Sequence, residues 1–361
     1  MERAQRPRRP FRLPPLTRDR LPLSASVEAI LRVALALVRN DGGIRSRRGL
    51  LRYPLRAAYF LAVAPFRPRL EASVGDLRYV VPTSDRTIAR SLFAGGDWEP
   101  LEVDAAYAAL AAAGYDDFDG KTFLEVGANL GMTSIGAVAE RGFAAAIAFE
   151  PEPGLFELLC ENIRRNGLGD RIRPIPLALS NRADTLLLET RAGNAGDNRI
   201  VASDRNGETT VAIHATTLDR EVEQGSVDLT TVGLVWMDVQ GHEPDVLAGA
   251  SALLESGIPI VLEYSTDMLR AAQRLDWLET VAMEHYAEFV DLGWSALTGR
   301  IAFQPVSELP RLSAGRRKTD TNLLLVARRP EPSQQVFETG DFGHNGAPRH
   351  PQGGAPGALS A

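Results

Sequence analysis

Two short apolar runs near the middle of the chain each end in residues that could bind a nucleoside cofactor. The first, Phe-Leu-Glu-Val-Gly-Ala-Asn-Leu-Gly at 123–131, ends in a glycine-rich turn. The second, Ile-Ala-Phe-Glu-Pro at 147–151, places Glu150 23 positions after Gly127. In a doubly wound sheet, an acid about 20 residues beyond the glycine turn binds the ribose hydroxyls of the ligand. The spacing therefore predicts a nucleoside-cofactor site.

The glycine turn favours a cofactor that has no pyrophosphate. Counted from Gly127, the dinucleotide fingerprint Gly-x-Gly-x-x-Gly requires two further glycines, where this chain has Asn129 and Met132. The carboxylate of Glu125, just before the turn, would repel a pyrophosphate but suits an amino-acid moiety. S-adenosylmethionine has an amino-acid moiety and a ribose and carries no phosphate. The sequence therefore favours S-adenosylmethionine over NAD.

A second group of polar residues follows the apolar run Leu-Val-Trp-Met at 234–237. Asp238 ends that run, and a carboxylate at the end of a central strand faces the ligand crevice. His242 lies in the same turn and, with a reference pKa of about 6.5, could act as a general base. Glu243 could serve the site or only interact favourably with the helix dipole. Glu263 ends the next apolar run, at the same predicted edge.

Alternating strands and helices are needed to bring these residues together. Short apolar runs alternate with amphipathic stretches, which is typical of a mainly parallel sheet with helices on both faces. Residues 181–231 exceed the length of a simple crossover and predict an inserted hairpin whose tip hangs over the site. We expect seven strands, near residues 122–126, 145–150, 172–177, 232–238, 258–264, 286–292 and 321–327.

Both ends of the chain differ in composition from its centre. Residues 1–22 contain five prolines and seven arginines and are expected to be a disordered arm. Residues 23–69 predict a helical extension that could pack on the main domain, lie on a membrane or bind a partner. The main domain is expected over 70–329, followed by a disordered tail over 330–361. Within the extension, we expect helices over Ser26–Arg39 and Leu50–Ala64.

The charge of the chain is unevenly distributed. Residues 1–70 contain sixteen arginines and four acids, although the whole chain has a net charge of -6. A basic segment of this kind could contact nucleic acid or an anionic membrane. Arginine is, however, the usual cation throughout, since the chain has only two lysines, Lys121 and Lys318. We therefore expect no nucleic-acid partner and a weak membrane contact, and the oligomeric state stays open.

Cysteine usage and hydropathy narrow the class of protein further. The single cysteine, Cys160, excludes a disulfide framework and a cysteine-based zinc site. It lies in an apolar helical pattern, so we expect a small core residue. No apolar run resembles a secretory signal or reaches the roughly 20 residues that span a bilayer. We expect a cytoplasmic protein.

Taken together and in order, the motifs resemble those of the FkbM-type methyltransferases. The resemblance covers about residues 70–328, and Thr-Asn-Leu-Leu-Leu at 321–325 matches the family's last strand. It implies the seven-stranded class I methyltransferase fold and methylation of hydroxyl oxygens on polyketides, sugars or glycans. The matching motifs are Glu-Val-Gly-Ala-Asn-Leu-Gly (125–131), Phe-Glu-Pro (149–151), Asn162 with Asn166, Ala-Leu-Ser (178–180), Thr-Leu-Asp (217–219), Met-Asp-Val-Gln-Gly-His-Glu (237–243), Leu-Ala-Gly-Ala (247–250) and Glu263.

The resemblance also implies roles for individual residues. Gly127, Asn129 and Gly131 would line the methionine end of S-adenosylmethionine. Glu150 would bind the ribose, and Ser180 would lie on the adenine side.

Two positions depart from the family pattern. Glu125 stands where the family usually has Asp, and this longer carboxylate can still reach the cofactor. Gln240 stands where the family usually has Glu, which removes a charge that a metal would need. We therefore expect no metal.

The leading hypothesis is an S-adenosylmethionine-dependent O-methyltransferase. Its acceptor would be a hydroxyl of a sugar, glycan or secondary metabolite, with Asp238 or His242 as the general base. One alternative is a nicotinamide-dependent oxidoreductase on a related sheet. Another is a non-catalytic adaptor that binds S-adenosylmethionine and attaches to a membrane or to nucleic acid. The sequence does not identify the acceptor.

Overall fold

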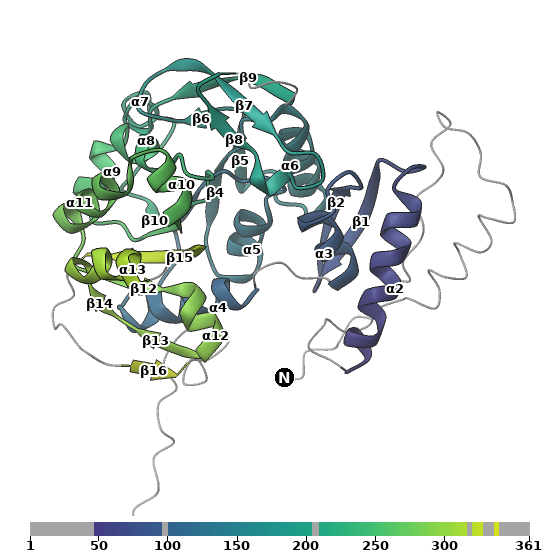
Figure 1. Ribbon diagram of the computed structural model, residues 1–361, viewed down its shortest axis with the longest axis horizontal. Coiled ribbons are helices and arrows are strands. Elements are labelled where there is room, and N and C mark those ends of the chain that lie inside the picture. Colours follow the sequence, from purple (N-terminus) through teal and green to yellow (C-terminus); the bar gives the residue numbers. More distant parts are fainter. Residues whose placement is uncertain (1–46, 96–99, 204–208, 316–319, 328–335, 339–361) are drawn as a thin grey trace, which may run out of the picture.

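A large mixed sheet forms the centre of the protein (Figure 1). The computed structural model describes residues 47–95, 100–203, 209–315, 320–327 and 336–338. The strand order is β14-β12-β15-β11-β10-β3-β4-β5. The pairs β10–β11, β10–β3, β3–β4 and β4–β5 are parallel, whereas β15 runs antiparallel to both of its neighbours. The expected α/β fold with a mainly parallel sheet is confirmed.

All seven strands predicted from the sequence are present. The eighth, β14, was not predicted because two residues are too few to carry a periodic pattern. The strands are β3 (Thr122–Val126), β4 (Ala145–Phe149), β5 (Ile172–Ile175), β10 (Val232–Met237), β11 (Ile260–Ser265), β12 (Glu288–Asp291), β14 (Gln304–Pro305) and β15 (Asp320–Val326).

The central strands are buried on both faces, which is why they read as almost continuous apolar runs. Successive side chains point to opposite faces of the sheet. Phe123 and Leu234 belong to one core, whereas Leu124 and Val235 belong to another. Helices cover the two faces and complete both cores: α4 (Pro100–Ala112), α5 (Met132–Glu140), α6 (Pro153–Arg165), α7 (Leu218–Glu223), α8 (Glu243–Ala248), α9 (Ser251–Ser256), α10 (Thr266–Ala271), α11 (Leu275–His285), α12 (Leu292–Thr298) and α13 (Leu309–Gly315).

Residues 178–216 form a second, smaller sheet with strand order β6-β9-β7-β8. Strands β7 (Asp184–Thr190) and β9 (Thr209–Thr216) pair antiparallel, as a hairpin requires. Strand β8 (Arg199–Val201) adds to β7, and β6 (Ala178–Leu179) adds to β9. A small apolar cluster of its own, Ala178, Leu188, Ile213 and Ala215, supports this sheet.

A hairpin and two helices precede the main sheet at one side of the molecule (Figure 1). They are α2 (Arg47–Val63), β1 (Arg69–Val74), β2 (Leu77–Pro82) and α3 (Ile88–Gly95). Helix α2 corresponds to the helix expected over Leu50–Ala64. The helix expected over Ser26–Arg39 and the arm expected over 1–22 lie outside the described residues. No helix within the described ranges has the length and apolar character to cross a bilayer.

Two asparagines, Asn162 of α6 and Asn166 at the C-cap of this helix, attach the hairpin to the main domain. Asn162 is fully buried; its Oδ1 accepts from Val80 N at 2.6 Å, and its Nδ2 donates to Leu130 O at 2.9 Å. One turn further on, Asn166 Oδ1 accepts from Arg78 N at 2.9 Å and Nδ2 donates to Arg78 O at 2.8 Å. Asn162 thereby connects β2 to the glycine turn after β3.

Part of the segment expected to be a disordered tail has regular structure. Val336–Glu338 forms β16, which pairs antiparallel with β13 (Arg300–Ala302). The expectation over 330–361 is therefore wrong at these three residues. The physical reason is that these three residues gain backbone partners by pairing with β13, and such pairing requires no long apolar pattern in the sequence.

Candidate active site

The chain order of the strands creates a crevice between β3 and β10. From β3 the chain continues outward to β4 and β5, then crosses back to β10 and continues to β11 on the other side. Ligands bind outside the carboxyl ends of the strands at such a switch point. A cavity of about 450 Å³ opens there, within the range typical of small-molecule sites.

Glycines allow the turn after β3 to approach β10 closely. Gly127 has a φ of +87°, and a Cβ on it would lie 2.0 Å from the carbonyl oxygen of Asp238. Gly131 has a φ of +77°, and a Cβ there would lie 2.4 Å from Leu159 of α6. Gly127 lines the cavity, whereas Gly131 does not. Gly131 therefore lets α5 start close to α6.

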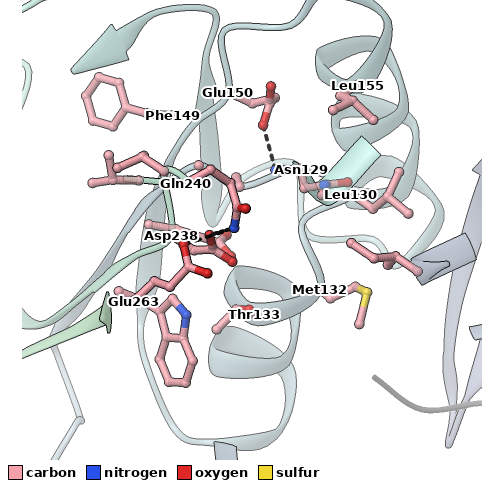
Figure 2. A pocket seen from close by; sticks show the side chains of 18 of the residues that line it. Asn129, Leu130, Met132, Thr133, Phe149, Glu150, Leu155, Asp238, Gln240 and Glu263 are labelled. Atoms are coloured by element: carbon pink, nitrogen blue, oxygen red, sulfur yellow. Dashed lines mark hydrogen bonds between the residues drawn. The ribbon is translucent and has the colours of Figure 1, made fainter. Parts of the chain in front are cut away.

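Asn129 lies at the tip of this turn and faces the cavity (Figure 2). Its φ is +50°, in the left-handed region that asparagine tolerates better than most residues. Its side-chain Oδ1 is buried and has no hydrogen-bond partner within the protein. A buried acceptor of this kind indicates a donor that a ligand would supply.

Glu150 follows β4 and points toward the same turn (Figure 2). Its Oε2 accepts from Asn129 N at 2.7 Å and its Oε1 accepts from Glu152 N at 2.8 Å. Burial raises the pKa of Glu150 to about 7, against the effect of these two hydrogen bonds. Each carboxylate oxygen keeps a lone pair for a ligand hydroxyl.

Glu125 lies beneath the turn and has a partly structural role. The residue is 3% exposed, and its Oε2 accepts from Ser134 N, in the first turn of α5, at 3.1 Å. Burial raises the pKa of Glu125 to about 8. It also lines the cavity, so one carboxylate both stabilises the start of α5 and faces the ligand space.

The carboxylates at the ends of β10 and β11 share one amide donor. Gln240 Nε2 donates to Asp238 Oδ1 at 2.8 Å and to Glu263 Oε2 at 3.0 Å (Figure 2). Burial, followed by the nearby charge of Asp238, raises the pKa of Glu263 to about 10, so the two carboxyl groups titrate as a pair. Asp238 is open to the cavity but otherwise enclosed by protein, and this burial raises its pKa too. In the described part of the chain, no three acids, histidines or cysteines are arranged to hold a metal ion.

The other residues of the Asp238 turn lie further from the carboxylate pair. His242 lines the cavity, and its Nε2 lies 2.9 Å from Ser180 Oγ. Burial lowers the pKa of His242, so the ring is neutral at neutral pH. Ser180 is buried behind His242 and does not line the cavity. Glu243 accepts from Val239 N at 3.0 Å and does not line the cavity, so it has a structural role in the turn before α8.

Several cavity residues were not identified from the sequence. Glu102 of α4 lines the cavity and accepts a hydrogen bond from Asn322 of β15, 220 positions away. No local spacing indicates such a contact. Asp320 was more accessible to prediction, because an antiparallel strand starts at the edge where parallel strands end. Residues 194–198, in the inserted segment, also line the cavity.

The strand order, the switch-point cavity and the carboxylate after the second strand define a class I methyltransferase. The sequence model of the family described as the methyltransferase FkbM domain matches residues 125–322. This match spans more than half of the chain, so the protein belongs to the FkbM methyltransferase family and is an S-adenosylmethionine-dependent methyltransferase. No curated protein matches the chain.

Solved structures resemble this chain at low sequence identity. An O-methyltransferase from Bacillus cereus in complex with SAH is 14% identical, with 64% of this chain and 83% of that chain covered and a TM-score of 0.31. P. horikoshii TYW2 in complex with MeSAdo is 12% identical, with 72% of each chain covered and a TM-score of 0.35. Because both TM-scores are below 0.5, the family assignment rests on the domain match.

Proposed function

We propose that this protein methylates a hydroxyl oxygen of a sugar, glycan or secondary metabolite. The observation that carries this proposal is the position of Asp238, a carboxylate that opens into the cavity at the end of the central strand. A hydroxyl acceptor must lose a proton during methyl transfer, and a carboxylate beside the methyl donor can accept it.

The cavity residues fit S-adenosylmethionine. The free lone pairs of Glu150 suit the two ribose hydroxyls, and the unpaired Oδ1 of Asn129 suits the ammonium group of the methionine moiety. Apolar residues beside Glu150, including Phe149 and Leu179, suit the adenine ring. When bound, the cofactor supplies a methyl carbon that forms a bond to the acceptor oxygen while its bond to sulfur breaks.

The charge of the cavity walls favours an uncharged or cationic acceptor. Among the described residues that line the cavity, nine are Asp or Glu and one, Arg141, is basic. Arg141 is already paired with Asp104. A phosphate or carboxylate group on the acceptor would meet repulsion with no available cation to offset it. Hydroxyl groups can instead donate hydrogen bonds to Glu102 and Asp238.

Asp238 fits the role of base better than His242. The hydrogen bond from Gln240 favours the charged form of Asp238, whereas burial and the charge of Asp238 raise the pKa of Glu263 further, so Asp238 is the better carboxylate of the pair. Its raised pKa brings it nearer to neutral pH, where a general base is most effective. His242 Nε2 is occupied by Ser180, so the ring serves better to orient the loop.

The proposal is tested by measuring S-adenosylhomocysteine release with sugar, glycan and polyketide hydroxyl acceptors. Asp238→Asn should lower turnover by roughly two to four orders of magnitude, the usual contribution of a general base. His242→Ala should have a smaller effect. Asp116→Asn, at an exposed position outside the cavity, is the matched control. Full turnover by Asp238→Asn, or methylation of nitrogen acceptors alone, would refute the proposal. Calorimetry with S-adenosylmethionine and NAD separately tests the oxidoreductase alternative.

A further inference from the structure

Over residues 53–63, where its side chains are described, helix α2 packs on the protein through one face. Phe60 on that face is fully buried, and the ring of Tyr59 stacks on Phe93 of α3 at 5.9 Å between centroids. Arg56 Nε donates to the carbonyl oxygen of Phe93 at 2.8 Å. The helix lies at the edge of the molecule (Figure 1), and its opposite face has no described neighbour that covers it.

The opposite face of α2 is exposed and apolar. Leu55 is 55% exposed, Leu61 is 42% exposed, and Phe66, in the turn after the helix, is 44% exposed. An exposed helix face of a soluble domain normally carries charged residues. Between residues 53 and 66, every exposed residue is apolar: Pro54, Leu55, Ala58, Leu61, Ala62, Pro65 and Phe66. Half of the large exposed hydrophobic residues described in this protein gather here.

The sequence around this face is strongly basic. Residues 42–70 contain seven arginines and neither Asp nor Glu. The arginines lie on both sides of the apolar run 57–66. A charge distribution of this kind is complementary to anionic headgroups, which attract nearby arginines. An apolar helix face flanked by cations is the pattern of a helix that lies in the plane of a membrane interface.

We propose that the exposed face of α2, extended by Phe66, binds the surface of an anionic lipid bilayer. The leucines and Phe66 enter the boundary between headgroups and acyl chains, and the net positive charge that the sequence carries over residues 42–70 attracts the anionic headgroups. The opposite face keeps its contact with α3, so binding requires no unfolding of the domain. This attachment is independent of the identity of the methyl acceptor.

Flotation of the full-length protein with vesicles tests the proposal. The vesicles contain phosphatidylcholine alone or phosphatidylcholine with phosphatidylglycerol. Binding should require phosphatidylglycerol and weaken with salt, because salt screens the arginines. The double variant Leu55→Glu with Leu61→Glu should lower the partition coefficient at least about tenfold, since it places charge on the inserted face. The control is Leu297→Glu on α12, which is 89% exposed and should bind as the wild type does.

The alternatives give different results. Equal binding by the wild type and the double variant would refute the proposal and assign the interaction to charge alone. Absence of binding to either vesicle would also refute it. If the double variant instead converts a dimer to a monomer in analytical ultracentrifugation, the face binds a second copy of the chain. Leu55→Ser with Leu61→Ser, a milder pair, should lower binding in the same direction at an unchanged melting temperature.

Discussion

Glu150 offers the most direct test of the cofactor site. In the wild type, each of its carboxylate oxygens accepts one backbone N–H, from Asn129 and from Glu152. The substitution Glu150→Gln keeps the size of the side chain and removes its charge. It also turns one acceptor into a donor, which then faces a backbone N–H. The variant therefore loses part of its ligand contact and part of its support for the glycine turn.

Both losses can be estimated. Charged hydrogen bonds contribute roughly 1 kcal/mol more than neutral ones, so two ribose bonds lose roughly 2 kcal/mol. This corresponds to an affinity for S-adenosylmethionine about 30-fold weaker. One buried backbone N–H without an acceptor costs about 1–3 kcal/mol of folding stability. Glu150→Ala removes both acceptors and should weaken binding at least as much.

Isothermal titration calorimetry with S-adenosylmethionine measures the first effect, and thermal unfolding of the ligand-free protein measures the second. The control is Glu157→Gln on the exposed side of α6, which removes the same charge away from the cavity. If folded Glu150→Gln binds the cofactor as tightly as the control does, the ribose assignment is wrong.

Two further predictions concern the ligand-free protein. The pKa values of Glu125 and Glu150 are raised from 4.5 to about 8 and about 7, so folding favours their protonated forms. The stability that these two groups contribute is complete below about pH 4.5 and is lost as the pH rises through about 7 and 8. A melting temperature that does not fall over this pH range would contradict the prediction. Asn162→Ala should lower the free energy of unfolding by about 1–3 kcal/mol in urea titrations, because it leaves Val80 N unpaired. The more exposed Asn166→Ala should cost less, and equal costs would count against this account.

The fold was largely predictable because its strands are buried on both faces. Most of the seven predicted strands are apolar runs bounded by turn residues, a pattern that needs no knowledge of contacts, whereas the edge strand β5 contains Arg173 and Pro174. Strands β6, β8 and β14 have only two or three residues each, and their pairing depends on neighbours that a local pattern does not contain. Strand β16 was missed for the same reason.

The site was predictable where strand ends determine it. Glu150 follows β4 and Asp238 follows β10, the parallel strands on either side of β3, so their meeting at one edge follows from the fold class. Glu102 belongs to a helix whose position depends on tertiary packing, and no spacing connects it to Asn322. Two predicted cofactor residues, Gly131 and Ser180, lie beside the cavity without lining it. Gly131 instead allows α5 to pack close to α6, and Ser180 holds His242 through its hydroxyl group.

Asn162 and Asn166, at the C-terminal end of α6, work together because one helical turn and two strand residues have nearly the same length. Asn162 and Asn166 are one turn apart, about 6 Å along the helix, and they bind residues two apart on β2, about 6.6 Å along the strand. Because the hydrogen bonds from both asparagines to β2 go to the peptide groups of Arg78 and Val80, these bonds do not depend on which side chains β2 carries. A single residue inserted into β2 between these two positions would break this match. The attachment therefore constrains the length of β2, whereas the identity of its buried side chains is constrained by the core.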